Sequence, residues 1–197
     1  MSVRAFKPLV FALCLLPALL LVWWAFAGGL GANPIEAITH HTGDWTLRFL
    51  LITLAVTPVR RLTGWNPVIR FRRMLGLFAF FYAALHLLTY VWLDQFFSWP
   101  AIVKDVVKRP FITVGFTAFV VLVPLAATST AGMIRRLGGR AWRRLHRLIY
   151  LAAVAGVVHY WWLVKADIRR PMRYGLVLAV LLSLRLWPLL VARLKRS

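Results

Sequence analysis

Long apolar runs dominate this sequence and limit what the chain can fold into. Of its 197 residues, 61% are hydrophobic, and most of them lie in a few long stretches. A run of about 18 or more apolar residues is long enough to cross a bilayer as a helix. A soluble domain has roughly half its residues apolar. Both the excess and its clustering therefore indicate a membrane protein.

Six runs are candidates for transmembrane helices. They are residues 9–27, 45–59, 75–93, 111–127, 145–164 and 174–191. The second is the shortest; Pro58 is expected near its end, and its start could reach back toward His41. The first run resembles a signal peptide, but its length of about 19 residues suits a retained helix. The sequence thus predicts an all-α membrane protein, a bundle of about six transmembrane helices forming one domain over residues 1–197.

The basic residues orient this predicted bundle. Fifteen lie at one set of run ends: Arg4, Lys7, Arg60, Arg61, Arg70, Arg72, Arg73, Arg135, Arg136, Arg140, Arg143, Arg144, Arg193, Lys195 and Arg196. Seven lie at the other set: Lys104, Lys108, Arg109, Lys165, Arg169, Arg170 and Arg173. Because cytoplasmic loops carry the excess of Lys and Arg, both termini are predicted to be cytoplasmic. The net charge of +20 is then explained by membrane lipid headgroups, with no nucleic acid as partner.

Two histidines inside the runs are the main candidates for function, because ionisable groups in a membrane are costly. His86 lies about 20 Å from the inner edge of its predicted helix and about 12 Å from the outer edge, at about 1.5 Å per residue. The corresponding distances for His159 are about 22 Å and about 9 Å. A porphyrin between two helices needs one imidazole from each side at matched depth. His86 and His159 are therefore predicted to be the axial ligands of a heme iron.

The other histidines carry less information. His146 lies about 20 Å inward of His159 on the same predicted helix, and the helix predicted at 75–93 offers no histidine at that depth. A second heme there would lack an evident partner ligand, so the role of His146 stays open. His40 and His41 are expected to be solvated residues of the outer loop 28–44. Zinc is a poor alternative to heme, because two histidines without a third ligand make a weak zinc site.

Arginines on the predicted inner face allow two interpretations. Arg72, Arg73, Arg143 and Arg144 could serve only as a topology signal that meets anionic lipid. They could also bind the phosphate of a cofactor, since guanidinium groups suit bidentate phosphate contacts. The residues alone favour the first interpretation. The single cysteine, Cys14, excludes a CxxC redox pair and an iron–sulfur cluster within this chain.

Three segments resemble a known family. They are RRMLGLFAFFYAALHLLTY, KRPFITVGFTAFVVLVPLAATS and GRAWRRLHRLIYLAAVAGVVHYWWLVKAD, at residues 72–90, 108–129 and 139–167. They are similar to the MsrQ (YedZ) family, heme-binding membrane subunits of the bacterial protein-methionine-sulfoxide reductase system, within the ferric-reductase-like transmembrane superfamily. The resemblance covers nearly the whole chain, and LHRLIY followed by HYWW is its most specific part.

The resemblance implies a multi-pass subunit of the bacterial inner membrane that transfers electrons and is not itself the catalyst. Heme b and FMN are the implied cofactors, with His86 and His159 as heme ligands and His146 as a further candidate. The FMN site carries over only to the inner basic face. The implied acceptor is the periplasmic molybdopterin reductase MsrP, and the implied donor is a cytoplasmic flavin reductase or the quinone pool.

Three other functions are alternatives for such a chain. A transmembrane cytochrome that reduces ferric iron directly is the nearest alternative, and it would need no periplasmic protein. A small transporter would need broken helices and a polar path at the midplane. A heme-free assembly scaffold would be colourless. The sequence contains no dinucleotide fingerprint and no soluble flavin domain, which favours a subunit that passes electrons between partners.

Overall fold

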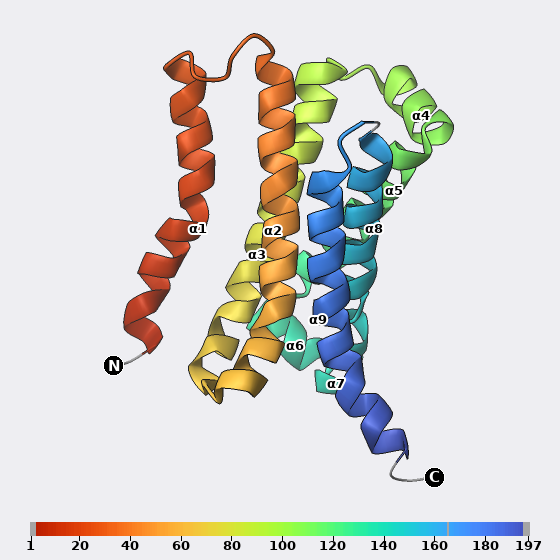
Figure 1. The fold of residues 1–197 in the computed structure, drawn as a ribbon. Helices are drawn as coiled ribbons and strands as arrows, with labels where there is room; N and C mark the ends of the chain where they lie inside the picture. Colours follow the sequence, from red (N-terminus) through yellow and green to blue (C-terminus); the bar gives the residue numbers. More distant parts are fainter. Residues whose placement is uncertain (1–2, 165, 195–197) are drawn as a thin grey trace.

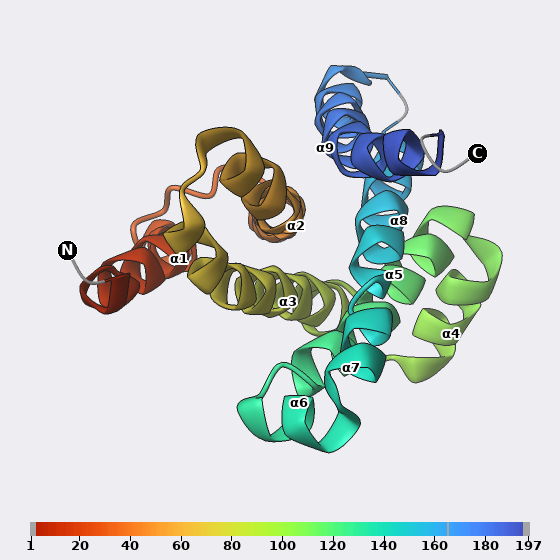
Figure 2. The same ribbon diagram turned by 90° about the horizontal axis from the view of Figure 1, so that it is seen from below.

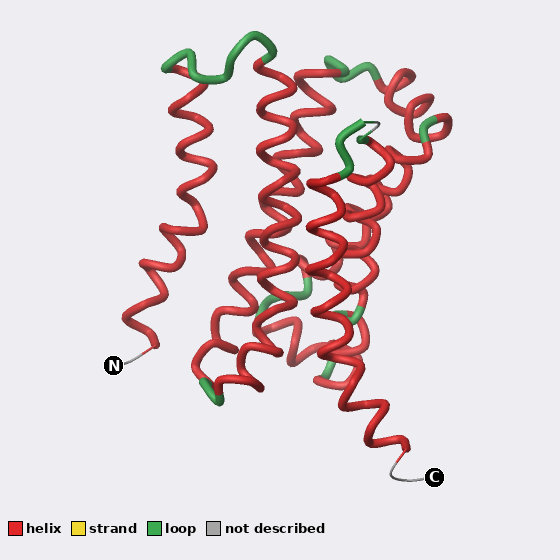
Figure 3. The backbone as a smooth tube through the Cα atoms, viewed as in Figure 1, coloured by secondary structure: helices red, strands yellow, loops and turns green. Residues whose placement is uncertain are grey.

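The computed structural model describes residues 3–164 and 166–194, with side chains from 5 to 164 and from 166 to 185. Helices joined by short loops account for most of this part (Figure 3). Lys165, Lys195 and Arg196, which the orientation argument counts, lie outside the described residues, as do the side chains of Arg4 and Arg193. The α-helices are α1 (Val3–Phe26), α2 (Pro34–Thr63), α3 (Arg72–Leu88), α4 (Trp99–Lys108), α5 (Pro110–Ala127), α6 (Ala131–Leu137), α7 (Gly139–Leu145), α8 (Leu148–Leu163) and α9 (Arg169–Leu194).

The long helices α1, α2, α3, α5, α8 and α9 run roughly along one axis (Figure 1). Helix α1 begins and α9 ends at the same end of the molecule, where α6 and α7 also lie. Three segments of the described chain are long and apolar enough to cross a membrane: Ala5–Phe26, Asn66–Asp94 and Pro110–Ala127. Helix α1 also exposes Leu9, Leu13 and Trp23, each by more than half. Such apolar surface suits lipid, and the chain is a multi-pass membrane protein.

Helix α2 is much longer than the apolar run that predicted it. The side chain of Asn33 caps its first turn by accepting a hydrogen bond from the backbone N–H of Glu36. Pro34 follows at the first helical position, where a missing N–H costs nothing. The helix continues past Pro58 and stops at Gly64, whose φ of 68° suits a glycine C-cap. The expected outer loop 28–44 is therefore wrong, because its second part is the start of α2.

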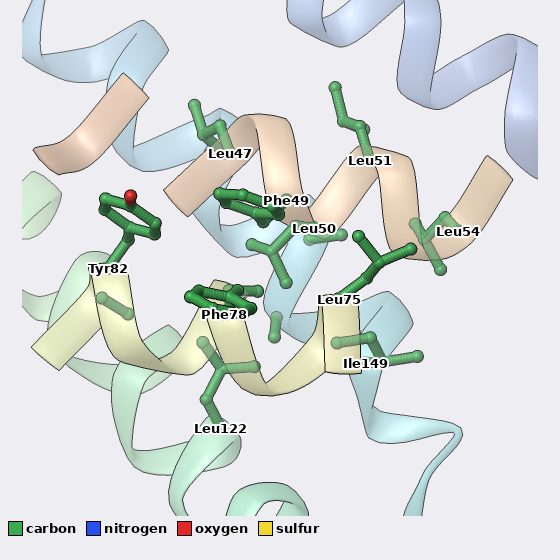
Figure 4. Close-up of a cluster of buried hydrophobic side chains, with 14 of the residues drawn as sticks. Leu47, Phe49, Leu50, Leu51, Leu54, Leu75, Phe78, Tyr82, Leu122 and Ile149 are labelled. Atoms are coloured by element: carbon green, nitrogen blue, oxygen red, sulfur yellow. The ribbon is translucent and has the colours of Figure 1, made fainter. Parts of the chain in front are cut away.

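Four helices enclose the core in a ring. The closest neighbours are α2 with α3 and α5 with α8; α3 also contacts α5, and α2 contacts α8. Figure 4 shows the centre of this core, where Phe49 of α2 stacks against both Phe78 and Tyr82 of α3. Leu122 and Ile149 reach the same cluster from α5 and α8. Helices α3 and α8 consequently occupy opposite corners of the ring.

Helix α1 packs at the edge of the ring, beside α2 and α3 (Figure 2). The Tyr82 hydroxyl donates to the Cys14 carbonyl at 2.8 Å and accepts from the Ala18 N–H at 3.1 Å. The Tyr82 hydroxyl thus inserts between the Ala18 N–H and the Cys14 carbonyl of α1, next to Pro17. A proline and an inserted side chain are both causes of helix bending. His41 contacts the Pro17 carbonyl through Nε2 at 3.0 Å. The prediction that His41 is a solvated loop residue is therefore wrong, whereas His40 is exposed and lies 3.5 Å from Glu36.

Short helices replace several expected loops. Helix α3 continues into a π-helix (Thr89–Asp94), and a 3₁₀-helix (Asn66–Phe71) precedes it. Helices α4, α6 and α7 lie where loops were predicted, because helices of 7 to 10 residues give no long apolar run. Among these three, Thr130 caps α6 by accepting a hydrogen bond from the N–H of Met133 at 3.1 Å. Helix α8 begins only at Leu148, so His146 lies between two helices and not on the long one.

Candidate functional site

The two histidines predicted to share a depth lie next to each other. His86 extends from α3 and His159 from α8, and their ring centroids are 6.1 Å apart with planes at 76°. A metal–imidazole bond is about 2 Å long, so a metal between two facing nitrogens separates the ring centroids by roughly 6 Å. The spacing therefore fits one metal ion held between both rings. The assignment of these rings as iron ligands stays a prediction.

The hydrogen bonds of His86 define which of its nitrogens is free. Its Nδ1 lies 3.0 Å from the Thr39 carbonyl and 3.4 Å from the Thr42 hydroxyl. That hydroxyl also bonds the Ile38 carbonyl at 2.8 Å, which uses its only proton. Both contacts therefore require a proton on Nδ1 of His86. In the neutral ring the lone pair is then on Nε2, the nitrogen that is available to a metal.

His159 is arranged in the same way. Its Nδ1 donates to the Phe111 carbonyl at 2.7 Å, and the Phe111 ring lies 6.3 Å from the imidazole. Its Nε2 is thus left with the lone pair. Metal-binding histidines commonly donate their second N–H to a carbonyl, which fixes the tautomer and makes the ligand more basic. Both rings show this arrangement.

His146 is placed differently. Its Nε2 lies 3.1 Å from the Thr128 hydroxyl, and its ring stacks on Trp142 with centroids 3.9 Å apart. The Thr128 hydroxyl also lies 2.6 Å from the Pro124 carbonyl, so its own proton is used there. Nε2 of a neutral His146 must then carry the proton and donate to Thr128. Binding iron through Nε2 would require His146 to give up this bond.

A cavity of about 300 Å³ adjoins His146 in the inner half of the ring. Its polar lining includes Arg72, Arg73 and His146, and its walls are mainly apolar side chains of α3 and α5. Thr53 also lines the cavity; its hydroxyl is buried and has no hydrogen-bond partner within the described chain. A buried polar atom without a partner is unusual and suits a place where a ligand supplies one.

The four predicted basic residues do not form one group. Arg143 and Arg144 line a separate hollow along α6 and α7, with Gly138 and Arg140. Only Arg72 and Arg73 reach the cavity beside His146. The inner basic face therefore divides into an internal part and a surface part.

Sequence reasoning missed Arg185. This arginine of α9 hydrogen-bonds the Tyr150 hydroxyl of α8 and the Leu54 carbonyl of α2, the latter at 2.7 Å. Its Nε is buried without a partner in the part of the chain that the structure describes. The signal was present in the sequence, since a charged residue within the run 174–191 is costly unless it binds something. Arg185 ties three helices together in the inner half.

The donor set at His86 and His159 suits heme iron better than a free metal ion. Among the described residues, no group of three or more His, Cys, Asp or Glu side chains is placed to hold a metal. Zinc needs at least three such protein ligands, whereas a porphyrin supplies four of its own and takes one imidazole from each side. Two imidazoles with free Nε2 atoms therefore fit the heme b that was predicted.

Comparisons with known proteins agree with this chemistry. Residues 42–157 match the family described as ferric reductase like transmembrane component. The protein-methionine-sulfoxide reductase heme-binding subunit MsrQ of Herminiimonas arsenicoxydans is 57% identical over 92% of this chain and 84% of its own length. Proteins of the same description from Rhodospirillum rubrum and Xanthomonas campestris pv. campestris are 58% and 55% identical, over 95% and 98% of this chain and 89% and 90% of their own. No solved structure matches the chain.

Proposed function

Because this chain belongs to the ferric reductase-like transmembrane family, and within it to the MsrQ heme-binding subunits of protein-methionine-sulfoxide reductase, we propose that it carries electrons across the bacterial inner membrane to the periplasmic molybdopterin reductase MsrP. The chain acts as an electron-transfer subunit, and the reduction of methionine sulfoxide takes place on the partner. The observation that carries this proposal is the pair of imidazoles, 6.1 Å apart, on opposite corners of the helix ring.

Heme b is the proposed cofactor of this pair, and when bound it supplies one-electron redox chemistry. His86 and His159 hold it through Nε2, and the carbonyls of Thr39 and Phe111 keep both rings in the tautomer that this requires. The aromatic core between α2 and α3, including Phe78 and Tyr82, is buried and keeps water out of the helix ring. These residues orient and shield the group without reacting themselves.

The outer end of the molecule is the proposed docking face for the acceptor. His86 and His159 lie about 10 Å from this end and about 20 Å from the inner one, by helical rise. Electron transfer falls steeply with distance, so this placement favours an acceptor on the periplasmic side. Residues 94–110 and 166–173 form the face, and Phe96, Phe97 and Trp99 are strongly exposed on it.

The inner cavity is the proposed entry point for electrons. Arg72 and Arg73 bind the phosphate of FMN there, with His146 beside it, and the Thr53 hydroxyl gains a partner. The donor is a cytoplasmic flavin reductase or the quinone pool. Arg143 and Arg144 lie outside the cavity and serve donor docking or contact with anionic lipid.

The docking face for the acceptor and the entry point for electrons both depend on how the chain is oriented in the membrane. We expect both termini in the cytoplasm, because the more basic loops lie at the end of the molecule where α1 begins and α9 ends. A fluorescent protein fused after Ser197 should therefore glow, and alkaline phosphatase fused there should be inactive. An active phosphatase would reverse the direction of electron flow proposed above.

The decisive experiment for the function is reoxidation of the reduced protein. The purified chain in detergent is reduced with dithionite, freed of excess reductant, and mixed with the periplasmic reductase in a stopped-flow spectrometer. We expect heme reoxidation only when the reductase and methionine sulfoxide are both present. Reoxidation that ignores both, but responds to ferric chelates, would instead identify the chain as a transmembrane ferric reductase. A colourless protein would exclude both cytochrome functions.

A further inference from the structure

Each of the two central imidazoles packs against a glycine of the neighbouring helix. A Cβ atom added to Gly43 of α2 would lie 3.1 Å from Cε1 and 3.2 Å from Nδ1 of His86. A Cβ atom added to Gly115 of α5 would lie 2.6 Å from Nδ1 and 2.9 Å from Cε1 of His159. Neither glycine has a positive φ, so conformational freedom of the backbone does not explain them. The space that they leave is filled by the imidazoles.

The glycines and the carbonyls that the rings bind follow one pattern. Thr39 and Gly43 are four residues apart on α2, and Phe111 and Gly115 are four residues apart on α5. Because a helical Cα–Cβ bond tilts toward the N-terminus, the side chain of one residue covers the backbone of the turn before it. A glycine therefore uncovers the carbonyl four residues earlier. Each imidazole enters that opening and donates its Nδ1–H to that carbonyl.

We propose that Gly43 and Gly115 are the positioning residues of the two heme ligands: each opens its helix surface so that an imidazole can dock there with Nδ1 on the backbone carbonyl one turn earlier. This inference rests on the proposed heme ligation by His86 and His159. It adds that the two helices which supply no ligand, α2 and α5, determine the tautomer and the direction of both ligands. The same arrangement, a glycine with an imidazole bound to the carbonyl one turn earlier, occurs once in each of the two closely packed helix pairs.

The hydrogen bond from each Nδ1–H to a backbone carbonyl has a chemical consequence at the iron. An Nδ1–H bonded to a carbonyl makes the other nitrogen more basic, and a more basic ligand stabilises ferric over ferrous iron. A methyl group at either glycine pushes the ring away from the carbonyl and weakens this bond. We therefore expect the midpoint potential to rise and the affinity for heme to fall by about tenfold, the lower range for loss of a supporting partner of a metal ligand.

The two positions should differ in size of effect. At Gly115 the nearest ring atom would be 2.6 Å from the new methyl group, so the His159 ring has to move. At Gly43 the closest approach is 3.1 Å, and a shift of a few tenths of an ångström relieves it. Gly115→Ala should thus disturb the heme more than Gly43→Ala.

Two other glycines provide matched controls, because neither would touch a histidine. A Cβ atom at Gly156 of α8 would lie 3.0 Å from Cδ2 of Leu47, which is as tight as Gly43 but touches no histidine. A Cβ atom at Gly175 of α9 would lie 3.7 Å from Cζ3 of Trp161, an ordinary contact. Gly156→Ala tests helix crowding alone, and Gly175→Ala tests the substitution alone.

The experiment compares the four alanine variants and the unaltered chain after purification. The readouts are heme per protein, the electron paramagnetic resonance spectrum of the ferric state and the midpoint potential, none of which needs the partner enzyme. We expect a shifted low-spin signal and a raised potential for Gly115→Ala, a smaller change for Gly43→Ala, and unchanged values for the two controls.

Several results would overturn the proposal. One is a Gly115→Ala protein with full heme, an unchanged low-spin signal and an unchanged potential. Another is a Gly156→Ala protein that shifts as much as Gly115→Ala, because crowding alone would then be the cause. If Gly115→Ala does not accumulate, Gly43→Ala decides on the same readouts. An unaltered chain that binds no heme is a failure of the proposed function, and it is visible before any variant is compared.

Discussion

The outer and inner halves of the helix ring hold histidines in opposite tautomers. In the outer half, His86 and His159 donate through Nδ1 to backbone carbonyls, which leaves both Nε2 atoms free. In the inner half, Nε2 of His146 is used by Thr128, and arginines replace a second histidine. The difference teaches that the hydrogen-bond partner of a histidine decides which of its two nitrogens is available to a metal.

The largest effect is expected from removing either outer ligand. His86→Ala or His159→Ala should lower heme binding by about a hundredfold or leave a high-spin heme, because the iron loses one of two protein ligands. Heme per protein and the absorption spectrum measure this. His40→Ala is the control, since His40 is an exposed histidine near the same end. A normal low-spin spectrum in full yield from His86→Ala would mean that the ligand pair is assigned wrongly.

The inner arginines should affect the rate of reduction and leave heme content unchanged. Changing Arg72 and Arg73 together to Gln should slow heme reduction by the cytoplasmic donor by about tenfold, because the cavity loses the charges that bind phosphate. The matched pair Arg143→Gln and Arg144→Gln should slow it less, since these residues line a separate hollow. Stopped-flow reduction provides the rates. Equal loss of membrane insertion in both pairs would favour a topology role alone.

His146→Ala should slow reduction by a few fold and keep the outer heme intact. The reason is that His146 lies beside the cavity and at the opposite end of the ring from the proposed heme. The ratio of heme to protein distinguishes the outcomes. A loss of half of the heme would contradict the contrast between the halves, because it would make His146 a ligand of a second heme.

The smallest effect should come from Tyr82→Phe. The hydroxyl of this buried residue makes two hydrogen bonds to α1, and without it the Ala18 N–H can bond the Cys14 carbonyl again. We expect a loss of about 1 kcal/mol in the free energy of unfolding, the usual net worth of a hydrogen bond. Thermal unfolding measures this, with heme absorbance as a control. A shifted heme spectrum would show that the packing of α1 reaches the outer site.

Much of the fold followed from apolar run length. Runs 75–93 and 111–127 correspond closely to α3 with its π-helical extension and to α5, because a membrane helix must be long and apolar. The errors fell where length gives no signal. Residues 34–44 extend α2 from the Asn33 cap, and α4, α6 and α7 are too short to give a long apolar run. The six-helix count and the cytoplasmic termini remain predictions.

The candidate site was predictable in its residues but not in its surroundings. Helical rise placed His86 and His159 at similar depth, and the structure brings their rings together. That Gly43 and Gly115 face these rings could not be predicted, because it depends on which helices are neighbours. His146 was expected on the long helix; a break at residues 146 and 147 separates it from α8.

The sequence by itself determined the membrane environment, the similar depth of His86 and His159 and the distribution of charge between the two ends. These properties depend on composition and on a fixed rise along one helix, so no knowledge of neighbours is needed. Only the tertiary structure decided which nitrogen of each histidine is free, which arginines share a cavity, and where Tyr82 and Arg185 bind. Those properties depend on contacts between residues far apart in the chain, and hydrogen bonds form only at short distances between correctly directed atoms.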